Sequence, residues 1–577
     1  MRILPFYLIV VRTVIFAILT IPFLHFSNVR DSILSSNEIG LYILCSICCI
    51  SVIPLIGNRI YLSQLELAVF SLLIFVPIIQ NYFVSGVSHL SMLKPFSYYI
   101  VFITISRFAK KYKSIILKFF YQSFFIIIHI TLIVVFLQLL NFLPNFYAVN
   151  NPTAFFNNPG PFGIFLALSV VMAFYFLRKP FSVRNIYLVF FIFIVFYFLI
   201  QSDSRSAWIS IIICLLMYIP LNKTILQNSL YIYIIVSFLI IIGYFLYIFK
   251  AQSANGRILI WLTSWEMFRE NWIFGVGLER FSVNFLKYQA SIFEINLFKR
   301  YLQNYADESQ AAFNDILHFA CERGIIGLTS ILIIVKSILF SKYFSINSDE
   351  KKDIEILRCL LLIIIISGLF SYPLQTIPLS LIFWTSLGIY NSYMYKVRYS
   401  FTLNRSFMII VILFIFSVTS YFTYYKYKSY RKWFQLEQRM SYKEENAMLS
   451  LYPFLYNRPS FLISLSKIYK VKGNMEKSIH FAEEAIALSS KKDHYYYLAD
   501  LYKDNGFPND AEKIYCYIEN SIPHLIRPKY LRSLLYYDYD CDRFYPMAIE
   551  TLRFHPKIES VYVYEMKQEL IKRLKVQ

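Results

Sequence analysis

Long apolar runs separated by short polar segments dominate the first 424 residues of the chain. A helix needs roughly 20 apolar residues to cross the hydrocarbon of a bilayer, with about 17 to 25 usual. The pattern therefore predicts an all-α, polytopic membrane domain of about 12–13 transmembrane helices over residues 1–424. The predicted spans are 5–26, 41–57, 67–82, 94–107, 117–142, 161–177, 185–201, 206–221, 229–249, 324–341, 358–372, 375–392 and 407–424.

The composition favours a membrane protein over a soluble one. Hydrophobic residues make up 58% of the chain, aromatic residues 19% and charged residues only 16%. One soluble globule cannot bury that much apolar surface. The first apolar run has Arg12 inside it and no small-residue cleavage site after it, so we interpret it as a span and not as a removed signal peptide.

The distribution of positive charge predicts the orientation of the spans. The net charge of +21 could indicate nucleic-acid binding, but with a cytoplasmic N-terminus 18 Lys and Arg residues fall in cytoplasmic short loops. Only three, Arg30, Lys94 and Arg205, fall in the opposite short loops. The positive-inside rule then makes residues 250–323 one large extracytoplasmic loop, and an odd number of spans puts the tail outside as well. We expect no nucleic-acid partner.

The polar tail, residues 425–577, contains an internal repeat of 33 residues. This period resembles that of tetratricopeptide repeats, in which small residues let paired helices approach and aromatic residues fill the grooves. Another array of helical hairpins is the alternative. Either reading predicts a soluble α-helical module that docks a partner protein and carries no catalytic signature. The recurring positions are Leu465, Tyr469, Gly473 and Ser478, matched by Leu498, Tyr502, Gly506 and Ala511.

Two arginines on the predicted external side are candidates for binding phosphate. Arg205 begins a span within Ser-Arg-Ser-Ala-Trp, and Arg257 stands at the start of the large loop within Arg-Ile-Leu-Ile-Trp. The planar guanidinium binds pyrophosphate oxygens bidentately and keeps its charge. An interfacial anchor at a span end is the alternative for Arg205. Because the external short loops are otherwise nearly free of Lys and Arg, we favour the binding role.

The end of the large loop carries candidate acid–base groups. Asp315, His318 and Glu322 fall at positions i, i+3 and i+7, so on a helix they share one face. A carboxylate and an imidazole on one face can do acid–base work, and a solvated helix face is the alternative. Accessory roles are predicted for Asn314, Glu322 and Arg280.

Three motifs on the predicted external side follow one another in order. They are Ser-Arg-x-x-Trp at 204–208, Arg-x-x-x-Trp at 257–261 leading to Gly-x-Gly-x-x-x-Phe at 275–281, and Asn-x-x-Leu at 314–317 leading to Glu-x-Gly-x-x-Gly at 322–327. In order and topology the region from 150 to 390 resembles the O-antigen ligase and polymerase superfamily of membrane glycosyltransferases. The resemblance implies that Arg205 and Arg257 bind the pyrophosphate of an undecaprenyl-linked oligosaccharide.

One position departs from the pattern of the ligases. Those proteins carry a His directly before the Asn of the loop-end helix, proposed as the base that activates the acceptor hydroxyl, whereas this chain has Phe313. His318 and Asp315 are then the two main candidates for the catalytic base, and Glu322 is a weaker candidate. Asn157 and Asn158, on the same external side, are candidates for lining an acceptor groove.

The resemblance implies an enzyme of the bacterial inner membrane that moves oligosaccharide from the lipid carrier to an acceptor on the outer face. The acceptor is lipid A–core for a ligase, another lipid-linked glycan for a polymerase, and a protein for a protein O-oligosaccharyltransferase. A lipid or polysaccharide transporter is the alternative from another class, but it should show ionisable residues at mid-span, which are few here. Because the donor is already activated, we expect no cofactor and no metal.

Overall fold

The computed structural model of the chain is almost entirely α-helical. It describes residues 3–23, 32–146, 151–177, 183–218, 251–295, 297–340, 348–394, 398–439 and 445–576, with isolated positions between 219 and 250. Within these ranges, strand is confined to β1 (Arg59–Leu62) and β2 (Tyr399–Thr402), which pair antiparallel. The predicted all-α fold is confirmed.

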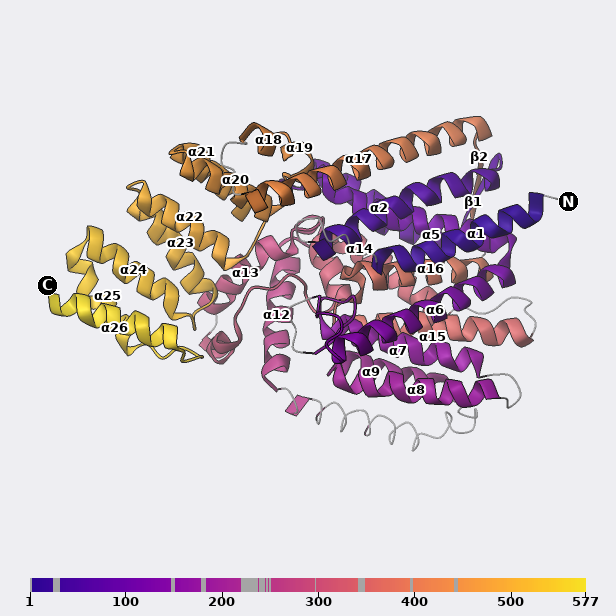
Figure 1. Ribbon diagram of the computed structural model, residues 1–577, viewed down its shortest axis with the longest axis horizontal. Coiled ribbons are helices and arrows are strands. Elements are labelled where there is room, and N and C mark those ends of the chain that lie inside the picture. The colour runs from indigo at the N-terminus through magenta and orange to yellow at the C-terminus, as the bar shows by residue number, and fades with distance from the viewer. Residues whose placement is uncertain are drawn as a thin grey trace.

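Twelve of the thirteen predicted spans overlap helices that pack into one bundle (Figure 1). The span predicted at 229–249 lies outside the described residues, isolated positions apart. The third span is one helix with a π-helical turn, η3, in its middle. The bundle contains α1 (Ile3–Thr20), η1 (Ile21–Phe23), α2 (Ser32–Val52), η2 (Ile53–Leu55), α3 (Gln64–Phe70), η3 (Ser71–Phe75), α4 (Val76–Phe83), η4 (His89–Met92), α5 (Leu93–Lys111), α6 (Lys113–Leu139), α7 (Pro159–Phe176), α8 (Val183–Gln201), α9 (Arg205–Tyr218), α14 (Asp315–Phe340), α15 (Ser348–Gly368), η6 (Pro373–Gln375), α16 (Ile377–Tyr393) and α17 (Arg405–Arg439).

The bundle is that of a polytopic membrane protein. Large apolar side chains of α8, among them Phe190, Phe193 and Ile200, are exposed on its surface, as expected where hydrocarbon replaces water. Three further apolar helices in the described part are shorter than a full span: Tyr7–Phe23, Asn185–Gln201 and Arg205–Cys214. The six helices that are long and apolar enough to cross a membrane are Ser36–Leu55, Gln64–Phe83, Lys113–Leu139, Pro159–Phe176, Asp315–Phe340 and Arg405–Gln438.

The core of the bundle is a continuous cluster of buried apolar side chains that includes Phe165 and Trp384. Helices α5 and α16 approach each other closely because Gly388 has no side chain. A Cβ atom there would lie 2.9 Å from the carbonyl oxygen of Phe102. Small residues at such contacts are typical of membrane bundles, in which lipid gives helices no hydrophobic drive to associate.

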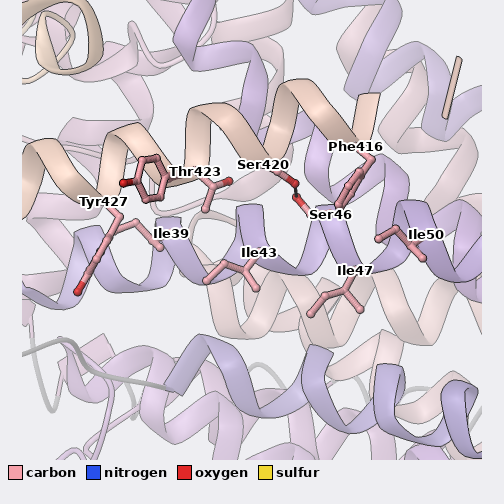
Figure 2. A pocket seen from close by; sticks show the side chains of 10 residues that line it. Ile39, Ile43, Ser46, Ile47, Ile50, Phe416, Ser420, Thr423 and Tyr427 are labelled. Carbon is pink, nitrogen blue, oxygen red and sulfur yellow. Dashed lines mark hydrogen bonds between the residues drawn. The ribbon is translucent and has the colours of Figure 1, made fainter. Parts of the chain in front are cut away.

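Helix α17 packs along α2 and carries the chain out of the bundle. At the centre of the contact Ser420 Oγ lies 3.2 Å from Ser46 Oγ (Figure 2). The predicted domain boundary at residue 424 falls inside this helix, which runs without interruption to Arg439, so the last span and the tail are joined by one rigid element. An apolar groove of about 400 Å³ lies between the two helices, lined among others by Ile39, Ile43, Ile47, Ile50 and Phe416.

Helix α14 is broken at Gly324, where the backbone has φ 62° and ψ −158°. The turn of residues 272–277 packs against the break and satisfies the backbone groups that it frees. Ile325 N donates to Trp272 O at 2.7 Å, and Val276 N donates to Cys321 O at 2.9 Å. Gly275 and Gly277 of this turn have positive φ, and a Cβ atom on Gly275 would lie 2.4 Å from Glu322 O, so the close backbone approach requires glycine.

Replacing Gly324 by alanine is expected to lower the melting temperature of the detergent-solubilised protein. A side chain in this backbone region costs about 1–3 kcal/mol, and a Cβ atom would lie 2.2 Å from Ile273 O. Gly256→Ala is the matched control, because nothing lies within 4 Å of a Cβ there and alanine stabilises a helix relative to glycine. Equal melting temperatures for the two variants would contradict this role of the break.

The predicted external loop, residues 250–323, is folded. It contains α12 (Ala251–Glu270), α13 (Phe281–Ile295) and η5 (Leu297–Tyr305), and α12 runs across the direction of the bundle helices (Figure 1). Met267 and Phe285 belong to a small core of this loop that also includes Ile522 of the tail. The loop and the tail therefore pack against each other.

From α20 (Pro459–Val471) to α26 (Val561–Val576), the tail helices pack in succession, each against the next (Figure 1). Gly473 and Gly506 lie just beyond the ends of α20 and α22 with φ of 75° and 77°, the left-handed conformation of a helix C-terminal cap. The 33-residue repeat thus corresponds to two similar helical hairpins, while their assignment as tetratricopeptide repeats stays a prediction. The tail helices are α18 (Glu445–Leu449), α19 (Tyr452–Leu455), α20 (Pro459–Val471), α21 (Met475–Ile486), α22 (Lys492–Asp504), α23 (Pro508–Ser521), α24 (Ile526–Tyr539), α25 (Cys541–Arg553) and α26 (Val561–Val576).

Candidate functional site

A polar cavity of about 540 Å³ lies where the bundle meets the external loop and the tail. Its walls come from segments that the sequence predicts to be external or at the external ends of spans. The structure therefore gathers these segments at one end of the bundle, while the side of the membrane that they face stays a prediction. The lining includes Asn37, Glu38, Lys94, Asn157, Glu279, Phe281, Glu308, Gln310, Phe313, His318, Glu322, Tyr372, Gln375 and Arg458.

Helix α14 brings His318 and Glu322 to the wall of this cavity. Their side chains are one turn apart, with His318 Nε2 3.5 Å from Glu322 Oε1. Both residues are buried, so the alternative of a solvated helix face is wrong. Nδ1 of His318 has no hydrogen-bond partner in the described part of the chain. The carboxylate can thus orient the imidazole, which is the arrangement of a base held by a third group.

Asp315 faces a different part of the structure. Its Oδ2 accepts a hydrogen bond from Leu374 N at 3.0 Å, and a Cβ on Gly368 would lie 3.0 Å from the same oxygen. Asp315 is not among the described residues that line the cavity. It ties the start of α14 to the turn between α15 and α16, so the geometry favours His318 over Asp315 as the base.

Two of the three residues predicted to be accessory, Asn314 and Arg280, position helices. Asn314 caps α14, because its Oδ1 accepts a hydrogen bond from Leu317 N at 3.0 Å. Arg280 Nη1 donates to Gly86 O at 2.6 Å and so anchors the start of α13 to the segment before α5. Neither side chain is among the described groups that line the cavity.

Arg205 and Arg257 lie next to each other, although 52 positions separate them in sequence. Arg205 Nη2 donates to Ser253 Oγ at 3.1 Å, and Ser253 is one turn before Arg257 on α12. Burial, together with the nearby charge of Arg205, lowers the pKa of Arg257 to about 10. Arg257 therefore stays charged at neutral pH. Two adjacent guanidinium groups are able to bind a multivalent anion.

Phe313, which replaces the His of the ligases, connects this arginine pair to the cavity. The guanidinium carbon of Arg257 lies 5.5 Å from the centroid of the Phe313 ring. The ring contacts Tyr372 edge to face, at 5.0 Å between centroids, and both rings line the cavity. Phe313 has φ 49°, which is rare for a bulky residue and costs energy that the surrounding structure must supply. Such strain is typical of functional sites.

Several lining residues were not singled out from the sequence. Lys94 could have been found from the sequence, because it is one of the three basic residues of the predicted external short loops. Glu38 and Arg458 form an ion pair across 420 positions and belong to no motif. Glu279 adopts φ 59°, a conformation that sequence does not reveal. Within the described ranges, no group of three or more His, Cys, Asp or Glu side chains is placed to hold a metal ion.

The fold and the site together define a polytopic membrane protein with a cavity at one end and a pair of arginines beside it. Residues 188–332 match the family described as O-antigen ligase. This stretch contains both arginines, Phe313 and the His318–Glu322 pair. A comparison with curated proteins finds no match. The match covers about a quarter of the chain and supports the resemblance over that region, which indicates glycan transfer from a lipid-linked glycan to an acceptor in general.

Proposed function

We propose that the protein transfers an oligosaccharide from undecaprenyl pyrophosphate to lipid A–core on the outer face of the bacterial inner membrane. In this proposal the N-terminus is cytoplasmic and the tail is periplasmic. The observation that carries it is the arginine pair, Arg205 and Arg257, held next to the cavity that contains His318 and Glu322. The family match supports glycan transfer, and the site supports the choice of donor.

The donor would bind with its pyrophosphate on the two guanidinium groups. Arg205 begins α9 at an end of the bundle, so a phosphate there sits at the level expected for a lipid headgroup while the polyprenyl chain stays in hydrocarbon. Phe313, which lies under the Arg257 guanidinium, and Tyr372 line the cavity on the side of this anion site. The first sugar would then lie between the arginines and His318.

The chemistry is a single displacement at the anomeric carbon. The acceptor oxygen forms a bond to this carbon while the bond to the pyrophosphate oxygen breaks, and the electron pair leaves with the pyrophosphate. The two arginines neutralise the charge that develops on the leaving group, a contribution that grows in the transition state. With Nε2–H donating to Glu322, the Nδ1 lone pair of His318 is left to accept the hydroxyl proton.

Complementation tests this function. The protein is expressed beside a supplied undecaprenyl-linked oligosaccharide pathway in a strain that lacks its own ligase and polymerase. We expect the glycan on lipid A–core, detected as shifted lipopolysaccharide on gels. A ladder of lipid-linked polymer, or glycan on proteins, would replace the ligase proposal with the polymerase or protein-transferase alternative. If all three products are absent despite good membrane expression, transfer is rejected and transport assays follow.

A further inference from the structure

The tail contributes to the cavity that contains His318. Arg458, just before α20, lines this cavity together with Glu38 of α2 and forms an ion pair with it. Glu38 also accepts hydrogen bonds from Lys426 Nζ of α17 and from Tyr42 OH, each at 2.7 Å. The bundle, the connecting helix and the tail therefore meet at one carboxylate in the cavity wall.

A second contact joins the tail to the cavity independently of the first. Glu308 lines the cavity, and its Oε2 accepts a hydrogen bond from Lys492 N at 3.0 Å. Lys492 is the first residue of α22, so the carboxylate lies at the positive end of a helix dipole. Its side-chain Nζ lies 3.0 Å from Asp307. The tail thus fixes the segment that leads to Phe313 and α14.

The arginine pair lies beside the cavity, and the Glu38–Arg458 pair lies in its wall, on different sides of the bundle. Helix α9, with Arg205, and helix α17, with Lys426, lie at opposite edges in Figure 1. In a displacement the attacking oxygen approaches the carbon from the side opposite the leaving group. If pyrophosphate is bound at Arg205 and Arg257, the acceptor must enter from the side of Glu38 and Arg458.

We propose that the tail forms the acceptor side of the catalytic cavity, with Arg458 as a specificity-determining residue that Glu38 holds in place. The inference rests on the proposed function. The Arg458 side chain is 32% exposed, so part of its guanidinium can donate to hydroxyl or phosphate oxygens of the acceptor while it remains paired. The tail is then part of the enzyme and does more than dock a partner.

The test is the kinetics of the full-length protein in detergent, with undecaprenyl-linked oligosaccharide as donor and lipid A–core from a ligase-deficient strain as acceptor. Arg458→Ala is expected to raise the KM for lipid A–core about tenfold, the effect of losing one charged hydrogen bond. The KM for the donor should stay within about twofold, because the arginine pair is untouched. Arg458→Lys should restore part of the loss.

Arg573→Ala is the matched control. Arg573 is also in the tail, pairs with Glu569 and is 30% exposed, and its Cζ lies 4.6 Å from the centroid of Tyr537. It should behave as wild type. An Arg458→Ala variant with unchanged acceptor KM, or with equal rises in both KM values, would overturn the inference. Absence of transfer by the wild-type protein would instead reject the proposed function, so the two failures are distinguishable.

Glu38→Gln provides a second variant that keeps shape and removes charge. If Glu38 acts by holding Arg458, the Glu38→Gln, Arg458→Ala double variant should raise the acceptor KM no more than Arg458→Ala alone. Multiplication of the two single effects would show that the residues act separately and would overturn the positioning role of Glu38.

Discussion

Arg257→Ala is expected to lower the rate of glycan transfer by about 100- to 1,000-fold, the cost of removing one fixed group that stabilises developing charge. Burial and the neighbouring Arg205 already lower the pKa of Arg257, so its charge is held in place at an energetic cost. A pyrophosphate between the two guanidinium groups removes that repulsion. The measurement is the initial rate of transfer from labelled donor in membranes, with protein amounts matched by immunoblot.

Arg269→Ala is the control for this variant. Arg269 lies on the same helix, α12, is 62% exposed and pairs with Glu266, far enough along the helix to leave the site intact. We expect wild-type rates for Arg269→Ala and only partial recovery for Arg257→Lys, because an ammonium group cannot bind two oxygens in one plane. Equal rates for Arg257→Ala and Arg269→Ala would contradict the pyrophosphate site.

Local patterns in the sequence were sufficient to predict the helices of the bundle and the arginine pair. Apolar runs of span length fix helices in lipid, because every backbone group must be satisfied within the segment. Arg205 and Arg257 each start a segment after a polar turn on the predicted external side, so their charge stands out against apolar surroundings. The resemblance implies that both bind one pyrophosphate, and the structure brings them together, with Arg205 donating to Ser253 one turn before Arg257.

The rest of the cavity could not be predicted, because it depends on contacts between distant segments. Glu38 and Arg458 come together only in the folded chain, because α17 connects the bundle to the tail and the tail packs near the start of α2. Asp315 and His318 are equivalent candidates on a helical wheel, and only the position of the 373–375 turn separates them. The break at Gly324 likewise depends on the turn about 50 positions earlier in sequence, where Trp272 O accepts a hydrogen bond from Ile325 N.

The second large effect is expected when the proposed catalytic base is replaced. His318→Ala is expected to lower kcat by about 100- to 10,000-fold, the range for loss of a general base. Asp315→Asn should lower it less than about tenfold, because an amide oxygen can still accept the hydrogen bond from Leu374 N. Single-turnover rates with bound donor and saturating acceptor measure this step without the contribution of substrate binding.

The comparison between these two variants decides between residues that are only three positions apart. If Asp315→Asn loses as much activity as His318→Ala and both proteins keep the wild-type melting temperature, the carboxylate and not the imidazole takes the proton. Glu322→Gln gives a further check, since it keeps a hydrogen-bond acceptor 3.5 Å from Nε2 but removes the charge that stabilises the imidazolium. Its rate should fall between those of the wild type and His318→Ala. A wild-type rate would mean that Glu322 only packs against the His318 ring. The site, which has Phe313 in place of the His of the ligases, would then use an imidazole that no charged group orients.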